Sequence, residues 1–174
     1  MNNVSLVIRE AQKDDFEWVE SVMQNTLEPY YGGDHRLHAK RIFNAHIAGG
    51  VDSLGFFSFE QRMFIAEIRG KKAGIIHLVG KRQATYKISP LIVVPEFQGR
   101  FGIGSQLLDH AESYARRHQS RQIYCTIAEK TLRRYSSFSV RDLLKREVPI
   151  VTTKLVLQKQ CFISHCTERV KSLH

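Results

Sequence analysis

Three glycines lie close together near the middle of the chain, in the segment Gln98-Gly99-Arg100-Phe101-Gly102-Ile103-Gly104-Ser105. A helical pattern of apolar residues begins inside this segment, at Ile103. The first N–H groups of a helix have no intrahelical partner, and the helix dipole favours negative charge there. Glycine lets a phosphate approach the backbone because it has no Cβ atom, and Arg100 adds a positive charge. The segment predicts a phosphate-binding loop; the alternative is a tight turn that packs a helix closely on a sheet.

Two well-known phosphate loops do not fit this segment. A P-loop needs Gly-Lys-Ser or Gly-Lys-Thr at the start of the helix, and neither is present. A dinucleotide-binding loop follows the first strand of a parallel repeat, whereas several predicted strands precede this one. The loop must therefore belong to another arrangement of strands and helices.

The elements that position the loop follow from hydrophobic periodicity and from turn residues. Asp14-Asp15 is expected to cap a helix with Phe16, Val19 and Met23 on one face, and residues 28–34 read as a break. Three strands joined by short turns predict an antiparallel meander before the loop. The predicted strands are residues 5–9, 62–69, 73–79, 84–94, 122–127 and 148–158, and the predicted helices after the break are residues 37–47 and 102–118. The class is α/β (α+β) with a mixed sheet, whose strands 84–94 and 122–127 are parallel.

The residues Val93, Pro95, Gln98, Gly99, Arg100, Gly102, Ile103, Gly104 and Leu107-Leu108 resemble the coenzyme A motif of the GNAT superfamily of N-acetyltransferases. The order of predicted elements over residues 5–130 is also similar to that fold. The resemblance implies a mixed central sheet whose fourth and fifth strands splay apart, with helices on its flanks. It also implies an enzyme that moves an acetyl group from acetyl-CoA, as co-substrate, to a primary amine of a small molecule or peptide.

The same resemblance implies which residues bind the coenzyme. The fourth strand carries a bulge, and its backbone binds the pantetheine arm and polarises the thioester carbonyl; these positions fall on Leu91, Ile92 and Val93. The pyrophosphate rests on the loop, which is one residue longer here than the family pattern. The implied loop residues are Gln98, Gly99, Arg100, Phe101, Gly102, Ile103, Gly104 and Ser105.

The catalytic side chains are less well defined by the pattern. Where the family often has a tyrosine that protonates the leaving thiolate, the chain has Phe138. Tyr135 lies three residues earlier on the same predicted helix face and is the candidate acid. Glu67 on the second meander strand is the candidate general base, because such a base must accept the proton of the incoming ammonium. His77, Lys87 and Ser89 are weaker candidates, and each candidate has a purely structural alternative.

The net charge of +9 is concentrated at the C-terminal end, where residues 131–174 hold 9 Lys and Arg against 3 Asp and Glu. A basic segment attracts polyanions. The alternative function is therefore a catalytically impaired GNAT-like domain that binds CoA or a polyanion without turnover. Nucleic acid is the less favoured partner, and a homodimer is left open.

Length and composition predict one domain. The resemblance implies that this GNAT-like acyltransferase domain covers residues 1–159, followed by a basic tail over residues 160–174. Three cysteines and the lack of a secretory pattern predict a cytoplasmic setting, and no apolar run is long enough for a membrane span. The tail contains Cys161, His165, Cys166 and His174, but it lacks the paired Cys-x-x-Cys that structural zinc prefers. We therefore expect no metal.

Overall fold

The computed structural model describes residues 5–49, 58–128 and 152–158. Side chains are described for residues 5–49 and 58–125. Three long helices and a sheet of six strands, in the order β1-β2-β3-β4-β5-β6, make up the described fold. Two short 3-10 helices, Lys13–Asp15 and Pro95–Phe97, complete it. The elements are β1 Leu6–Glu10, α1 Phe16–Tyr31, α2 Arg36–Ile47, β2 Glu60–Ile68, β3 Lys71–Lys81, β4 Thr85–Val93, α3 Ile103–Arg117, β5 Gln122–Ala128 and β6 Thr152–Gln158.

The sheet is mixed, as the sequence predicts. Strands β1 to β4 pair antiparallel with one another in sequence order, and β2, β3 and β4 form the expected meander. Strands β4 and β5 are parallel, and α3 connects them. The last predicted strand also lies beside β5, in parallel. It begins at Thr152, and residues 148–151 lie outside the described part of the chain.

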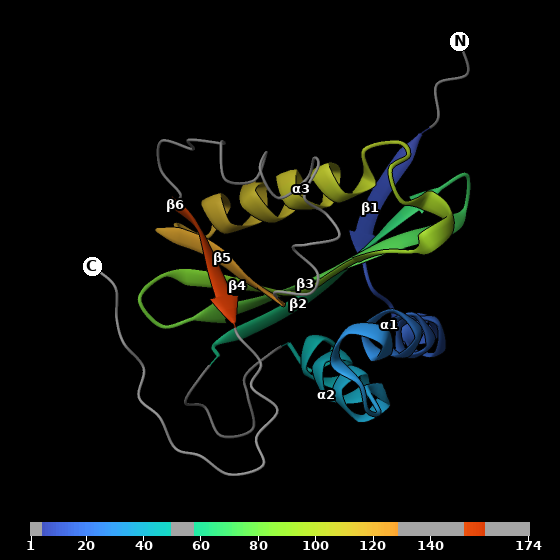
Figure 1. The fold of residues 1–174 in the computed structure, drawn as a ribbon. Coiled ribbons are helices and arrows are strands. Elements are labelled where there is room, and N and C mark those ends of the chain that lie inside the picture. The colour runs from blue at the N-terminus through green and yellow to red at the C-terminus, as the bar shows by residue number, and fades with distance from the viewer. Residues whose placement is uncertain (1–4, 50–57, 129–151, 159–174) are drawn as a thin grey trace.

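Helices cover both faces of the sheet, α3 on one and α1 with α2 on the other (Figure 1). Alternate residues of a strand point to opposite faces, so the meander contributes to two cores. Phe64, Ile76 and Leu78 pack in the core that contains α3. Met63 and Ile75 pack in the core that contains α1 and α2.

Helix α3 buries the apolar face that its sequence predicts. Ile103, Leu107, Leu108, Ala111 and Ala115 are all buried, and they recur at the spacing of one helical face. Burial of this stripe ties the start of the helix, and with it the glycine-rich loop, to the middle of the sheet. The position of the loop is therefore set by core packing.

Two local predictions differ from the structure at α1. The helix continues through Pro29 to Tyr31, so the break is limited to the residues just after it. Pro29 lacks an N–H, but the Gly32 amide still donates to the Glu28 carbonyl (2.8 Å) and closes the last turn. Asp15 occupies the cap position without a side-chain capping bond. Its buried carboxylate accepts instead from the Gln12 amide (2.7 Å) and pairs with Arg9 and Lys72.

Candidate functional site

Strands β4 and β5 separate along their length. Their pairing runs only from Thr85 opposite Gln122 to Ile88 opposite Cys125. Both strands continue beyond these residues, β4 to Val93 and β5 to Ala128. Within the described residues, β4 beyond Ile88 is thus unpaired on the side of β5. The expected splay is confirmed, and it leaves backbone groups of residues 91–93 free on that side.

The bulge in β4 lies just before the residues on which the sequence placed the bulged backbone. On β3, Ile76 pairs with Leu91 and Leu78 pairs with Ile88, so Ser89 and Pro90 together lie opposite one residue, His77. Proline lacks an N–H for the ladder and is found in sheets at edges or bulges. Leu91, Ile92 and Val93 follow the bulge and pair regularly with β3. Pro90 within the predicted strand was the sequence signal for this location.

The loop after β4 is held by its own polar contacts. The Val94 amide donates to the Ala73 carbonyl (3.0 Å), which fixes the end of the strand. A 3-10 turn, Pro95–Phe97, follows. The Gln98 side-chain amide donates to the Val93 carbonyl at 2.9 Å. Gln98 therefore has a structural bond that shapes the loop, whatever else it contacts.

The N-terminus of α3 is open to an anion. The first intrahelical bond runs from the Gln106 amide to the Gly102 carbonyl (3.0 Å), so the amides of residues 103–105 precede the helical ladder. Gly102 occupies the cap position without a side-chain capping bond, and no acidic residue lies in the first turn. Both Gly102 and Ser105 are exposed. This arrangement fits the phosphate-binding interpretation.

The glycines of the loop occupy their positions for different physical reasons. Gly99 and Gly102 have φ values of +69° and +61°, which glycine adopts without a steric cost. A Cβ atom at Gly104 would meet only the Val93 side chain, at an ordinary 3.7 Å. Close helix–sheet packing therefore does not explain Gly104. The glycine that allows such packing is Gly74 on β3, where a Cβ atom would lie 2.9 Å from the Ile92 carbonyl oxygen.

Phe101 lies in the lengthened part of the loop, between Gln98 and Gly102. It is half-exposed and has a φ of +58°, a left-handed conformation that is unfavourable for a residue with a Cβ atom. The lengthened loop thus contains one residue other than glycine with a strained backbone.

The candidate base Glu67 forms an ion pair. Its Oε1 atom accepts from Arg9 at 2.6 Å (Nη2) and 3.0 Å (Nε). It lies opposite Lys72 on β3, near the β2–β3 turn and two strands away from β4. This contact gives Glu67 a structural role and does not support its role as base, which stays a prediction. The candidate acid Tyr135, like Phe138, lies outside the described residues.

The weaker candidates lie at the bulge or beside it. His77 is 1% exposed, and its Nδ1 is 2.7 Å from the Ser89 carbonyl oxygen. Burial lowers the pKa of His77 to about 4, so the imidazole is neutral near pH 7. Lys87 pairs with Val79 in β3, before the bulge. The sequence singled out these residue types but not their position at the bulge.

A half-buried carboxylate that the sequence did not suggest joins β2, β4 and α3. Glu60 accepts from the hydroxyls of Tyr86 (2.5 Å) and Tyr114 and from Arg62 Nε (3.0 Å). Burial opposes its ionisation, but these hydrogen bonds outweigh burial and lower the pKa of Glu60. Tyr114 also stacks on His118. The cluster lies on the α3 face, at the paired end of β4, and it braces the helix that carries the loop.

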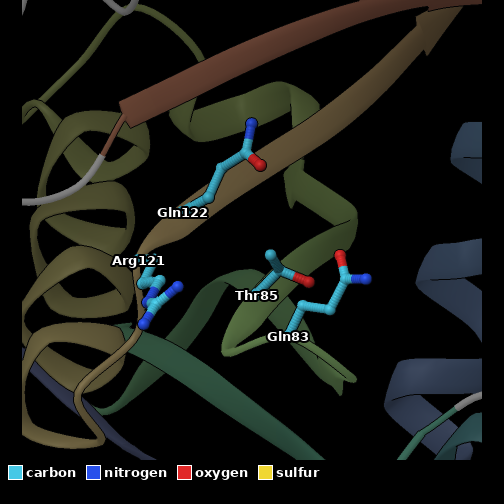
Figure 2. Close-up of a pocket in the computed structure, with 4 residues that line it drawn as sticks. All are labelled: Gln83, Thr85, Arg121 and Gln122. Carbon is cyan, nitrogen blue, oxygen red and sulfur yellow. The ribbon is translucent and has the colours of Figure 1, made fainter.

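Two open hollows lie outside the loop. The larger, about 610 Å³, is lined by Gln83, Thr85, Arg121 and Gln122 (Figure 2). Thr85 and Gln122 begin β4 and β5, so this hollow is at the opposite end of β4 from the loop. A hollow of about 310 Å³ lies between α1 and the turn after β4, with Trp18, Lys72 and Glu96 among its lining residues. Neither hollow contains the unpaired backbone of residues 91–93.

The described residues contain no group of three or more His, Cys, Asp or Glu side chains that could hold a metal ion. The Cys and His residues of the tail lie outside that part of the chain. No described helix combines the length and apolar character needed to cross a membrane.

The structure thus combines a mixed α/β sheet, an opened β4–β5 pair, a bulge in β4 and an uncapped glycine-rich helix start. The family model of the acetyltransferase (GNAT) domain matches residues 60–138. This match covers the meander, the loop, α3 and β5. The resemblance found in the sequence is thereby confirmed: residues 60–138 are similar to the acetyltransferase (GNAT) domain.

Solved structures show the same fold at low sequence identity. A GNAT acetyltransferase from Staphylococcus aureus is 14% identical, with a TM-score of 0.61, over 76% of this chain and 79% of that one. A GNAT acetyltransferase from Brucella melitensis, solved with acetyl-CoA, is 19% identical, with a TM-score of 0.56, over 80% and 86%. An aminoglycoside 6'-N-acetyltransferase solved with coenzyme A is 15% identical, with a TM-score of 0.53, over 68% and 60%. No curated protein sequence matches the chain.

Proposed function

We propose that the chain is an acetyl-CoA-dependent N-acetyltransferase that acts on a primary amine of a small molecule or peptide. One observation carries the proposal: residues 89–93 of β4, which within the described chain do not pair with β5, lead through a short turn into an exposed helix start without an acidic residue in its first turn. A thioester arm and a pyrophosphate need these two features side by side. The similar folds solved with acetyl-CoA or coenzyme A support the same assignment.

The pyrophosphate contact is assigned to the loop. The amides of residues 99–105 include those that precede the helical ladder, and Arg100 is exposed beside them. Backbone donors at a helix start favour a bound anion over water because their dipoles are already aligned. The loop thus holds the coenzyme without a dedicated side chain, apart from the charge of Arg100.

The thioester contact is assigned to the β4 backbone of Leu91, Ile92 and Val93. Acetyl-CoA supplies an acetyl group on a thioester, which an amine nitrogen can attack. A β4 N–H directed toward the splay donates to the carbonyl oxygen as negative charge develops on it. The two strands hold the acyl carbon near the amine. The amine loses a proton, for which Glu67 remains a candidate acceptor, and the thiolate gains one, for which Tyr135 is the proposed donor.

Calorimetry with acetyl-CoA tests the coenzyme site. Gly104→Glu should weaken binding about tenfold or more, because it places bulk and a negative charge beside the pyrophosphate. Gly104 is the better position than Gly102, since Gly102 has a positive φ that strains any substitution. Asn44→Glu is the matched control, because it adds the same charge at an exposed position of α2. Equal affinities in two folded variants would contradict the assignment.

Turnover distinguishes the enzyme from a binding module. Release of free thiol from acetyl-CoA should depend on an added primary amine, tested over a panel of small amines and peptides. Deleting residues 160–174 should leave coenzyme binding and folding intact, because terminal tails make few buried contacts. Coenzyme binding without turnover, together with salt-sensitive binding to heparin that is lost on truncation, would favour the polyanion-binding alternative.

A further inference from the structure

His77 is a buried histidine with one hydrogen bond, and that bond is made to the bulge of β4. Its Nδ1 lies 2.7 Å from the carbonyl oxygen of Ser89. A carbonyl can only accept, so Nδ1 carries the proton and Nε2 has the lone pair. Nε2 is buried and has no hydrogen-bond partner among the described residues. The side chain therefore offers one donor, and it is directed at the bulge.

His46, which packs on the same face of the sheet, shows what a purely structural histidine does. Its Nε2 donates to the Ala11 carbonyl (2.9 Å), and its Nδ1 accepts from the Met63 amide (3.2 Å). Both nitrogens are satisfied, and they link α2 to β2 and to the end of β1. At His77 an apolar side chain of similar size would fill the same space without an orphaned nitrogen. The hydrogen bond to the Ser89 carbonyl therefore explains why this position has a histidine.

The Ser89 carbonyl needs this donor. At the bulge two β4 residues face one β3 residue, so one of them is left out of the regular ladder. Ser89 is half-buried, and a carbonyl that faces the buried His77 has a free-energy cost if it lacks a hydrogen-bond partner. If the strand relaxed to a regular register to regain a partner, every later residue would move by one position. A one-residue slip turns each side chain to the other face of the sheet.

We propose that His77 is a positioning residue for acyl transfer: its Nδ1–H holds the Ser89 carbonyl, fixes the bulge, and so sets the backbone of residues 91–93 against the thioester. The proposal rests on the proposed function for its catalytic meaning. The bulge and its hydrogen bond are observed independently of that function.

The test compares substitutions that keep or remove the donor. In His77→Asn the amide nitrogen can occupy the place of Nδ1, whereas in His77→Gln it lies one bond further, near Nε2. His77→Leu removes the donor at similar volume. His110→Leu is the matched control: His110 is a half-buried histidine of α3, on the other face of the sheet, that likewise has an Nε2 without a partner among the described residues.

Steady-state kinetics per folded molecule should separate these variants. His77→Leu and His77→Gln should lower kcat about tenfold or more, because a loosened bulge misplaces the donor to the thioester oxygen. KM for the amine should stay within about threefold, because a donor that acts on the thioester oxygen changes the transition state more than it changes binding of the amine. His77→Asn should recover kcat to within about threefold of the natural chain, and His110→Leu should match the natural chain. If His77→Leu does not fold, the Asn and Gln variants give the comparison.

Amide hydrogen exchange at Ile92, whose N–H faces β3 as that of Val94 does, provides a readout that needs no turnover. Exchange should be faster in His77→Leu and His77→Gln and protected again in His77→Asn. Natural kcat per folded molecule in every variant, or unchanged exchange at the Ile92 amide, would overturn the proposal. If the natural chain gave no turnover with any amine, the proposed function would have failed, and exchange alone would decide whether His77 holds the bulge.

Discussion

Gly74 sets how closely α3 approaches the sheet, and replacing it with alanine tests this directly. An added Cβ atom would lie 2.9 Å from the Ile92 carbonyl oxygen. It would also lie 3.2 Å from Leu107 Cδ1 and 3.3 Å from Ile103 Cγ2. The nearest atom belongs to the backbone of β4, so no rotamer change relieves the contact. Either the helix or the coenzyme-binding strand must move.

The expected loss of stability follows from two opposing effects. Overpacking a core typically costs about 1–3 kcal/mol. Alanine also reduces the entropy of the unfolded chain, which stabilises the protein by about 0.4–1 kcal/mol relative to glycine. Gly74→Ala should therefore lower the free energy of unfolding by about 1–2 kcal/mol. For a chain of this size that corresponds to a fall in Tm of about 2–8 °C.

Gly104→Ala is the matched control, because both positions lie where α3 meets the sheet. Its Cβ atom would meet Val93 Cγ2 at 3.7 Å, an ordinary contact, inside a helix where alanine is favoured. Urea denaturation followed by circular dichroism should show this variant to be as stable as the natural chain or more stable by up to about 1 kcal/mol. A Gly74→Ala variant at least as stable as Gly104→Ala would refute the reasoning, and so would unaltered acetyl-CoA affinity alongside a large loss of stability.

Three further predictions concern single side chains. Glu60→Gln should lower the free energy of unfolding, measured by urea denaturation at pH 7, by about 2 kcal/mol, because the half-buried carboxylate accepts several hydrogen bonds. Since the folded pKa of Glu60 is lowered, this difference should shrink as the pH falls below its ordinary value of 4.5; a constant difference would contradict it. Phe101→Gly should raise the free energy of unfolding by about 1 kcal/mol, because it removes the strain of a left-handed backbone. A less stable variant would show that the contacts of the Phe101 ring stabilise the fold by more than this strain costs. Burial, with His46 and His38 nearby, lowers the pKa of His77 from 6.5 to about 4. The neutral imidazole therefore makes its full contribution to the free energy of unfolding above pH 6.5, and this contribution is lost as the pH falls toward 4. His77→Asn should therefore lose about 3 kcal/mol less stability than the natural chain over that interval, and parallel pH curves would count against it.

The sequence determined the parts of the fold that depend on local pattern. The alternation of the meander, the apolar stripe of α3 and the turn residues between them were sufficient to predict the mixed sheet and its parallel β4–β5 pair. The glycine-rich helix start was also readable, because the chemistry of an uncapped helix is local. The resemblance to the GNAT motif added the splay, which no pattern within a single strand reveals.

The tertiary structure decided which residues meet, because distance along the chain says little about distance in space. Arg9 pairs with Glu67 across 58 positions, a contact that no local sequence pattern indicates. In the sequence Gly74 is simply a residue of a predicted strand. The close packing of α3 and β4 around it shows why a side chain does not fit there. His77 and Ser89 are 12 positions apart and meet because β3 and β4 form a hairpin with a bulge. Sequence patterns report periodicity, whereas a site depends on register and packing between elements, which are fixed only when the sheet forms.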